Sequence, residues 1–141
     1  MRLARVGLES VAGYLGGGMQ AWIADDLETG SIPQISVEQL RSRLETEGDL
    51  QVVDVRRPAE YESGHVPRAL SAPLTPPLAE QLSGLDKEHP VAVICAGGYR
   101  SSAATSLLAR RGFRHLLNVT GGTGAWIKAG HPVEKQMMNA E

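Results

Sequence analysis

From residue 35 onward, apolar residues follow helical and extended spacing in turn. Val37, Leu40 and Leu44 fall on one helical face, and Ser36 with Gln39 forms a capping box before them. Strands joined by helices imply an α/β fold, in which a mostly parallel central sheet carries helices on both faces. Short apolar runs predict strands at 50–55, 69–72, 91–94 and 116–119, and helical spacing predicts helices at 36–47, 58–62, 76–82, 101–111 and 122–129.

The composition is typical of a soluble protein with one main domain. The chain has 141 residues, 42% of them hydrophobic and 21% charged, and a net charge of −2. It has no basic block for nucleic acid, no apolar run long enough to span a bilayer, and no apolar stretch typical of a signal peptide. We therefore expect a cytoplasmic protein without nucleic-acid or membrane partners. The four histidines are scattered, so we predict no metal site and no cofactor.

The only cysteine, Cys95, lies between a predicted strand and a predicted helix. A strand that ends there places the sulfur at the carboxyl edge of the sheet, where open α/β folds bind ligands. The next helix directs its free N–H groups and the positive end of its dipole at the loop. We predict a thiolate with a lowered pKa, although such a cysteine is often only a small buried apolar residue. The candidate loop comprises Cys95, Ala96, Gly97, Gly98, Tyr99, Arg100 and Ser101.

Loop length indicates the chemistry. Four residues separate Cys95 from Arg100, whereas tyrosine phosphatases and related arsenate reductases enclose a tetrahedral oxyanion with five. The shorter loop forms a smaller cradle, which suits one added sulfur atom better than phosphate. The pattern C-x-x-G-x-R-S resembles the active-site loop of the rhodanese-like sulfurtransferases.

Further motifs extend this resemblance over about residues 34 to 133. They are Asp54-Val55-Arg56, Glu60-Tyr61, Gly64-His65-Val66, and Gly121-Gly122 with Trp126. Arg68 departs from the pattern, because many family members have glycine there. The resemblance implies a rhodanese-like domain over residues 31–134, and we expect a mobile tail over 135–141.

The resemblance also implies a reaction. The Cys95 thiolate would take sulfane sulfur from thiosulfate or a persulfide, and a thiol or cyanide would then remove it. The N–H groups of the loop would stabilise the anionic sulfur, and Arg100 would shape the loop and attract anionic donors. With no second cysteine in this sequence, a partner molecule or domain would have to accept the sulfur. A sulfur-carrier or regulatory docking module with little activity is the alternative, and the short loop disfavours a small phosphatase.

Four polar residues are candidates for a supporting role. Asp54 could accept hydrogen bonds from the loop or pair with an arginine. Arg56 and Glu60 are four apart, a spacing typical of a surface ion pair, and the resemblance places them at the rim of the pocket. For His65 we expect a packing or hydrogen-bonding role rather than that of a general base. Tyr99 should face outward and is a candidate for substrate selection.

An internal repeat marks the first thirty residues. Residues 3–8 parallel 108–113, and residues 17–23 (GGMQAWI) parallel 121–127 (GGTGAWI). Residues 1–30 are therefore expected to be the C-terminal remnant of an upstream rhodanese-like repeat with its linker, and Trp22, like Trp126, should pack a terminal helix on a sheet. The resemblance implies a parent protein with tandem rhodanese-like domains, for which fusion to a persulfide dioxygenase of the metallo-β-lactamase fold is the leading hypothesis.

Overall fold

The computed structural model describes residues 10–74 and 82–135. The first half of the repeat at residues 3–8, the helix predicted at 76–82 except for its last residue, and nearly all of the predicted tail lie outside these ranges. Among the described residues, no helix is long and apolar enough to cross a membrane.

The predicted parallel sheet is confirmed, with five strands in the order β1-β5-β4-β2-β3. All four pairings between neighbouring strands are parallel. The strands are β1 (Gln34–Ile35), β2 (Gln51–Asp54), β3 (Leu70–Ser71), β4 (Val91–Ile94) and β5 (Leu116–Val119). Strand β1 was not predicted, because two residues are too few to show an alternating pattern.

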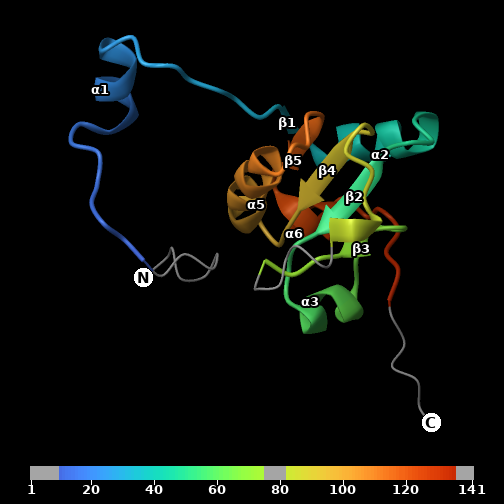
Figure 1. The fold of residues 1–141 in the computed structure, drawn as a ribbon. Helices are drawn as coiled ribbons and strands as arrows, with labels where there is room; N and C mark the ends of the chain where they lie inside the picture. Colours follow the sequence, from blue (N-terminus) through green and yellow to red (C-terminus); the bar gives the residue numbers. More distant parts are fainter. Residues whose placement is uncertain (1–9, 75–81, 136–141) are drawn as a thin grey trace.

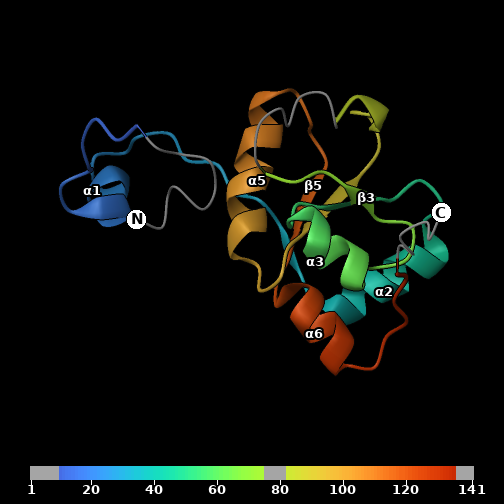
Figure 2. The same ribbon diagram turned by 90° about the horizontal axis from the view of Figure 1, so that it is seen from below.

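Helices cover both faces of this sheet, as predicted (Figure 1 and Figure 2). Helix α5 begins two residues before its predicted start, so Tyr99 and Arg100 belong to its first turn. The capping box of α2 forms as predicted, with Gln39 N–H 3.1 Å from the Ser36 hydroxyl. The helices of the domain are α2 (Val37–Thr46), α3 (Pro58–Ser63), the short 3-10 helix η2 (Leu82–Gly84), α5 (Tyr99–Arg110) and α6 (Gly122–Lys128).

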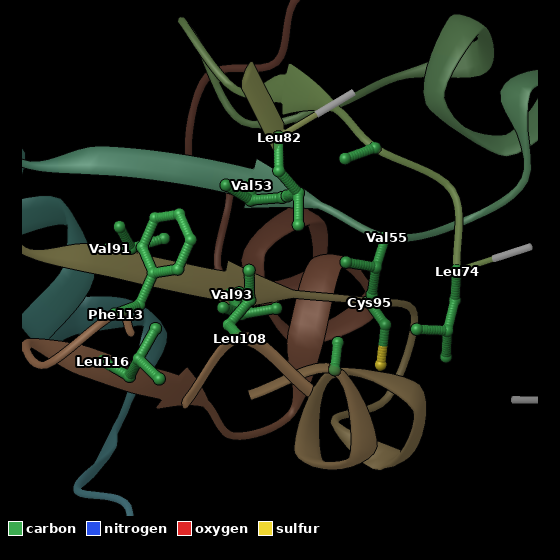
Figure 3. Packing of buried hydrophobic residues seen from close by; sticks show 12 residues of the cluster. Val53, Val55, Leu74, Leu82, Val91, Val93, Cys95, Leu108, Phe113 and Leu116 are labelled. Carbon is green, nitrogen blue, oxygen red and sulfur yellow. The ribbon is translucent and has the colours of Figure 1, made fainter. Parts of the chain in front are cut away.

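Strand β4 is buried on both faces and divides the core into two clusters. Val91, Val93 and Cys95 form a row on the α5 side, which Figure 3 shows. Ala92 and Ile94 belong to the opposite cluster, to which α2 and α6 contribute. A strand with no solvent-exposed face is typical of a sheet between two helical layers. It holds Cys95 rigidly at the carboxyl end of the sheet.

Helix α1 (Gly18–Ala24) lies apart from this domain (Figure 1). None of its residues is buried, and Met19 and Ile23 are each 58% exposed. Trp22 packs on no sheet among the described residues, and its expected packing on an upstream unit stays a prediction. Trp22 is partly buried, and its indole N–H donates a 2.8 Å hydrogen bond to the carbonyl of Glu28 within the same segment.

Candidate active site

The sulfur of Cys95 lies at the end of β4, beside the first turn of α5. The backbone N–H of Gly98 donates to Sγ over 3.1 Å, and the hydroxyl oxygen of Ser101 lies 3.4 Å from Sγ. The side chains of Cys95 and Ser101 are almost completely buried. The structure thus surrounds one sulfur atom with polar hydrogen atoms inside an otherwise apolar cluster.

These contacts determine the pKa of Cys95. Burial is the largest single influence and raises the pKa, because it penalises a charged sulfur. The hydrogen bonds from the Ser101 hydroxyl and from the backbone of Ser101, Gly97 and Gly98 together outweigh burial. The pKa is therefore lowered from the ordinary thiol value of 9.0, which agrees with the prediction from the sequence. The positive end of the α5 dipole favours the thiolate as well.

Helix α6 supports the loop from the opposite side. Thr123 N–H donates to the Cys95 carbonyl over 2.7 Å, and Gly124 N–H donates to the Ala96 carbonyl over 3.0 Å. A Cβ atom on Gly122 would collide with both carbonyl groups. Because α6 binds these carbonyls, the N–H groups of the loop remain available to the sulfur. The glycine pair was visible as a motif in the sequence, but its role was not, because that role depends on contacts between distant residues.

Arg100 is held by Glu60, which no sequence pattern predicted. Two hydrogen bonds of 2.8 and 3.0 Å join the guanidinium to the carboxylate, and Arg57 adds a contact of 3.2 Å. The hydrogen bond from Arg100 is the main reason why the pKa of Glu60 falls from 4.5 to about 2. The same carboxylate raises the pKa of Arg100 above its ordinary value. These two residues are forty positions apart, so spacing along one helix could not reveal them.

The predicted ion pair between Arg56 and Glu60 does not form. Arg56 is buried and pairs instead with the completely buried Asp54, at 2.8 Å between Nη2 and Oδ2. Its Nη2 also donates to the Gly64 carbonyl over 2.7 Å. The chain turns sharply after β2, which brings Arg56 back onto Asp54 and away from Glu60. Of the two roles left open for Asp54, the structure shows the pairing with an arginine.

His65 has the structural role that we expected. Its ring stacks on Tyr61 with 3.7 Å between the centroids, and Nδ1 lies 2.7 Å from the Tyr61 carbonyl oxygen. The Tyr61 hydroxyl donates to the Ala69 carbonyl over 2.6 Å. This group ties α3 to the segment that leads into β3. It therefore positions the element that carries Glu60.

The remaining loop residue, Tyr99, faces outward as predicted, with 60% of its surface exposed. The structure thus brings together Cys95, Gly98, Ser101 and the Glu60–Arg100 pair, whereas Asp54, Arg56 and His65 form a supporting network around α3. Within residues 10–74 and 82–135, no three His, Cys, Asp or Glu side chains are grouped so that they could hold a metal ion.

Known proteins share this architecture. The family model described as "Rhodanese-like domain" matches residues 36–129. A sulfurtransferase of Allochromatium vinosum is 34% identical over 72% of this chain and 94% of its own length. A Bacillus subtilis protein assigned as a sulfur carrier is 31% identical over 68% of this chain and 51% of its own length. The solution structure of a rhodanese-like domain from Anabaena superposes with a TM-score of 0.68 at 33% identity, over 79% of this chain and 85% of that one.

Proposed function

The chain belongs to the rhodanese-like domain family, and we propose that it is a sulfurtransferase that carries sulfane sulfur on Cys95. One observation carries the proposal: Gly98 N–H and the Ser101 hydroxyl both contact the sulfur inside a loop of four residues before Arg100. The name of the similar Allochromatium protein supports it. Small sulfur donors and thiol acceptors are the partners that this reaction needs, and a cytoplasmic location fits them.

In the first step, the Cys95 thiolate attacks the outer sulfur of a persulfide or of thiosulfate. A new S–S bond forms to Cys95 while the old one breaks, and the electron pair leaves with the donor's thiolate or with sulfite. The product is Cys95–S–S⁻, so the negative charge moves outward by one atom. The N–H groups of the loop stabilise the charge there, as an oxyanion hole stabilises a developing oxyanion.

In the second step, an acceptor thiolate or cyanide attacks the outer sulfur. The bond to Cys95 breaks, the thiolate is regenerated, and a new persulfide or thiocyanate leaves. No electron acceptor is needed, because each step exchanges one S–S or S–C bond for another. Cys95 has only 1% of its surface exposed, which favours small donors whose sulfur can enter the loop.

Mass spectrometry of the intact protein tests this proposal. After incubation with glutathione persulfide or thiosulfate, we expect a mass increase of one sulfur atom, which cyanide removes with release of thiocyanate. The Cys95→Ser variant should gain nothing. If the wild type gains no sulfur from either donor, the proposal is wrong. Hydrolysis of an aryl phosphate by the protein would instead favour the phosphatase alternative.

The carrier alternative is favoured by the ion pair between Arg100 and Glu60. A guanidinium that already binds a carboxylate through two hydrogen bonds has less capacity to attract a dianion such as thiosulfate. The similarity to the Bacillus protein assigned as a sulfur carrier is a further reason. For a carrier, we expect stoichiometric loading of Cys95 by persulfides but negligible turnover of thiosulfate with cyanide. Rapid catalytic thiocyanate formation would reject it.

A further inference from the structure

Helix α1 repeats the local structure of α6 in detail. In both segments the residue before the helix and the first helical residue are glycines in the left-handed region, and the residue eight positions after the first helical residue also has positive φ. The three φ angles are 80, 63 and 53° at Gly17, Gly18 and Asp26, and 77, 60 and 77° at Gly121, Gly122 and Gly130. A short Gly/Ala/Trp helix alone does not require this agreement.

The side-chain contacts repeat as well. The indole N–H of Trp22 donates to the carbonyl of Glu28, and that of Trp126 donates to the carbonyl of Pro132, each over 2.8 Å and six residues ahead. The closing turns match too, since the carbonyl of each tryptophan accepts an N–H five residues later over 3.3 Å. Residues 17–28 therefore form the same structural unit as residues 121–132.

The two copies differ in what surrounds them. In α6, Trp126 is 1% exposed, and the N–H groups of Thr123 and Gly124 bind the carbonyls of the Cys95 loop. Gly122 lies so close to that loop that a Cβ would not fit. In α1, a Cβ added to the equivalent Gly18 would meet no non-local atom within 4 Å among the described residues.

The backbone N–H groups in the first turn of α1 also lack the acceptors that their counterparts in α6 have among the described residues. The equivalents of Thr123 and Gly124 are Met19 and Gln20, whose N–H groups lie in the first helical turn, where the helix itself provides no acceptor. Within the described residues, no backbone hydrogen bond outside the helix uses them. The helix thus retains the donors, the close-approach glycine and the tryptophan with which α6 closes its domain.

We propose that α1 is the closing helix of a second rhodanese-like unit, which precedes it in the parent protein. Met19 and Gln20 bind the loop carbonyls of that unit, and Gly18 allows the close approach. The order of elements argues for this occupant, because the sheet, α2 and the Cys95 loop against which α6 packs all precede α6 in the sequence. A second copy of this chain is a poorer fit, because its own α6 already occupies the equivalent position.

Hydrogen exchange tests the proposal by comparing this chain with the protein expressed from the complete gene. In the present chain, we expect the amides of Met19 and Gln20 to exchange rapidly and those of Thr123 and Gly124 slowly. In the complete protein, the exchange of Met19 and Gln20 should slow by about 100-fold or more, because opening then requires the upstream unit to unfold. A complete gene without an upstream rhodanese-like unit, or unchanged exchange of these two amides, would overturn the proposal.

A matched pair of variants gives a second readout. Gly18→Ala should leave the thermal unfolding of the present chain unchanged, whereas in the complete protein it should lower the upstream unit's Tm by about 5 °C or more. Gly13→Ala, at a position that also has free space but no positive φ, is the control and should change neither. Sedimentation of the present chain should show a monomer. A dimer with protected Met19 and Gln20 amides would instead identify a second copy as the occupant and reject the proposal.

Discussion

Replacing Ser101 by alanine measures how strongly the loop stabilises a thiolate. Ser101 is completely buried, and its hydroxyl lies 3.4 Å from the Cys95 sulfur. When Cys95 is ionised, this hydroxyl donates to a charged acceptor, and a hydrogen bond of that kind contributes about 1.5–3 kcal/mol. One pKa unit corresponds to about 1.4 kcal/mol. The Ser101→Ala variant should therefore have a Cys95 pKa about 1–2 units above that of the wild type.

The assay is the rate of alkylation by iodoacetamide as a function of pH. The midpoint of the profile should move upward by the same 1–2 units. At a pH below both pKa values, the thiolate population falls about 10- to 100-fold, but a more basic thiolate is also more nucleophilic, with a Brønsted slope near 0.5. The net rate at such a pH should thus fall only about 3- to 10-fold.

Ser102→Ala is the matched control. Ser102 occupies the next position of α5, but its side chain is exposed, so the same chemical change should leave the midpoint where it is. If Ser101→Ala keeps a wild-type far-UV spectrum and an unchanged midpoint, the hydroxyl does not stabilise the thiolate. The lowered pKa would then need another cause.

The lowered pKa of Cys95 also predicts how stability depends on pH. The folded protein binds its thiol proton less tightly than the unfolded chain, so it holds fewer protons between the two pKa values. The thiolate contribution is therefore fully present above pH 9.0 and is lost as the pH falls through the folded pKa. Urea unfolding should show that wild type gains stability relative to Cys95→Ser over this interval as the pH rises. A constant difference would contradict the lowered pKa.

Substitutions at three positions test the ionic network and the strained turn. Glu60→Gln should cost about 1–2 kcal/mol at pH 7 after allowance for solvent screening, and because the folded pKa is depressed to about 2, this loss should persist down to pH 4.5 and shrink below it. Asp54→Asn leaves the buried charge of Arg56 without its partner and should cost about 3 kcal/mol in urea unfolding. Arg68 has a φ of 67°, so Arg68→Gly should be about 0.5–1 kcal/mol more stable than Arg68→Ala.

Each of these predictions has an outcome that contradicts it. A Glu60→Gln deficit that stays constant from pH 7 to pH 3 would mean that ionisation of Glu60 contributes nothing. An Asp54→Asn variant as stable as the wild type would show that Arg56 finds another partner. If the glycine and alanine variants at Arg68 unfold at the same urea concentration, the left-handed backbone there is not strained.

Local sequence patterns predicted much of the fold. The capping box at Ser36, the buried run before Cys95 and the glycine-rich turn after it were enough to predict α2, β4 and α5, because each depends on residues that are neighbours in the chain. The same patterns predicted that Cys95 lies at the carboxyl end of a strand. Predicted helix and strand ends differ from the observed ones by a residue or two, because capping geometry depends on the surrounding contacts.

Such patterns could not predict contacts between residues that are distant in the sequence. Arg56 and Glu60 have the spacing of an ion pair, yet the turn after β2 directs Arg56 onto Asp54 and leaves Glu60 for Arg100. Both carboxylates carry the same charge and the four-residue spacing favours Glu60, so only the path of the backbone explains why Arg56 pairs with Asp54. The support of the loop by α6 could not be predicted either, because it also joins residues that are distant in the sequence.

The sequence by itself thus determined the chemistry that is available: one cysteine, a loop of four residues before Arg100, and a segment at 17–23 that repeats 121–127. The tertiary structure decided which groups act on that cysteine. It directs the N–H of Gly98 and the hydroxyl of Ser101 at the sulfur, and α6 at the carbonyls behind it. A pKa depends on groups within a few ångströms of an atom, and folding alone brings those groups together.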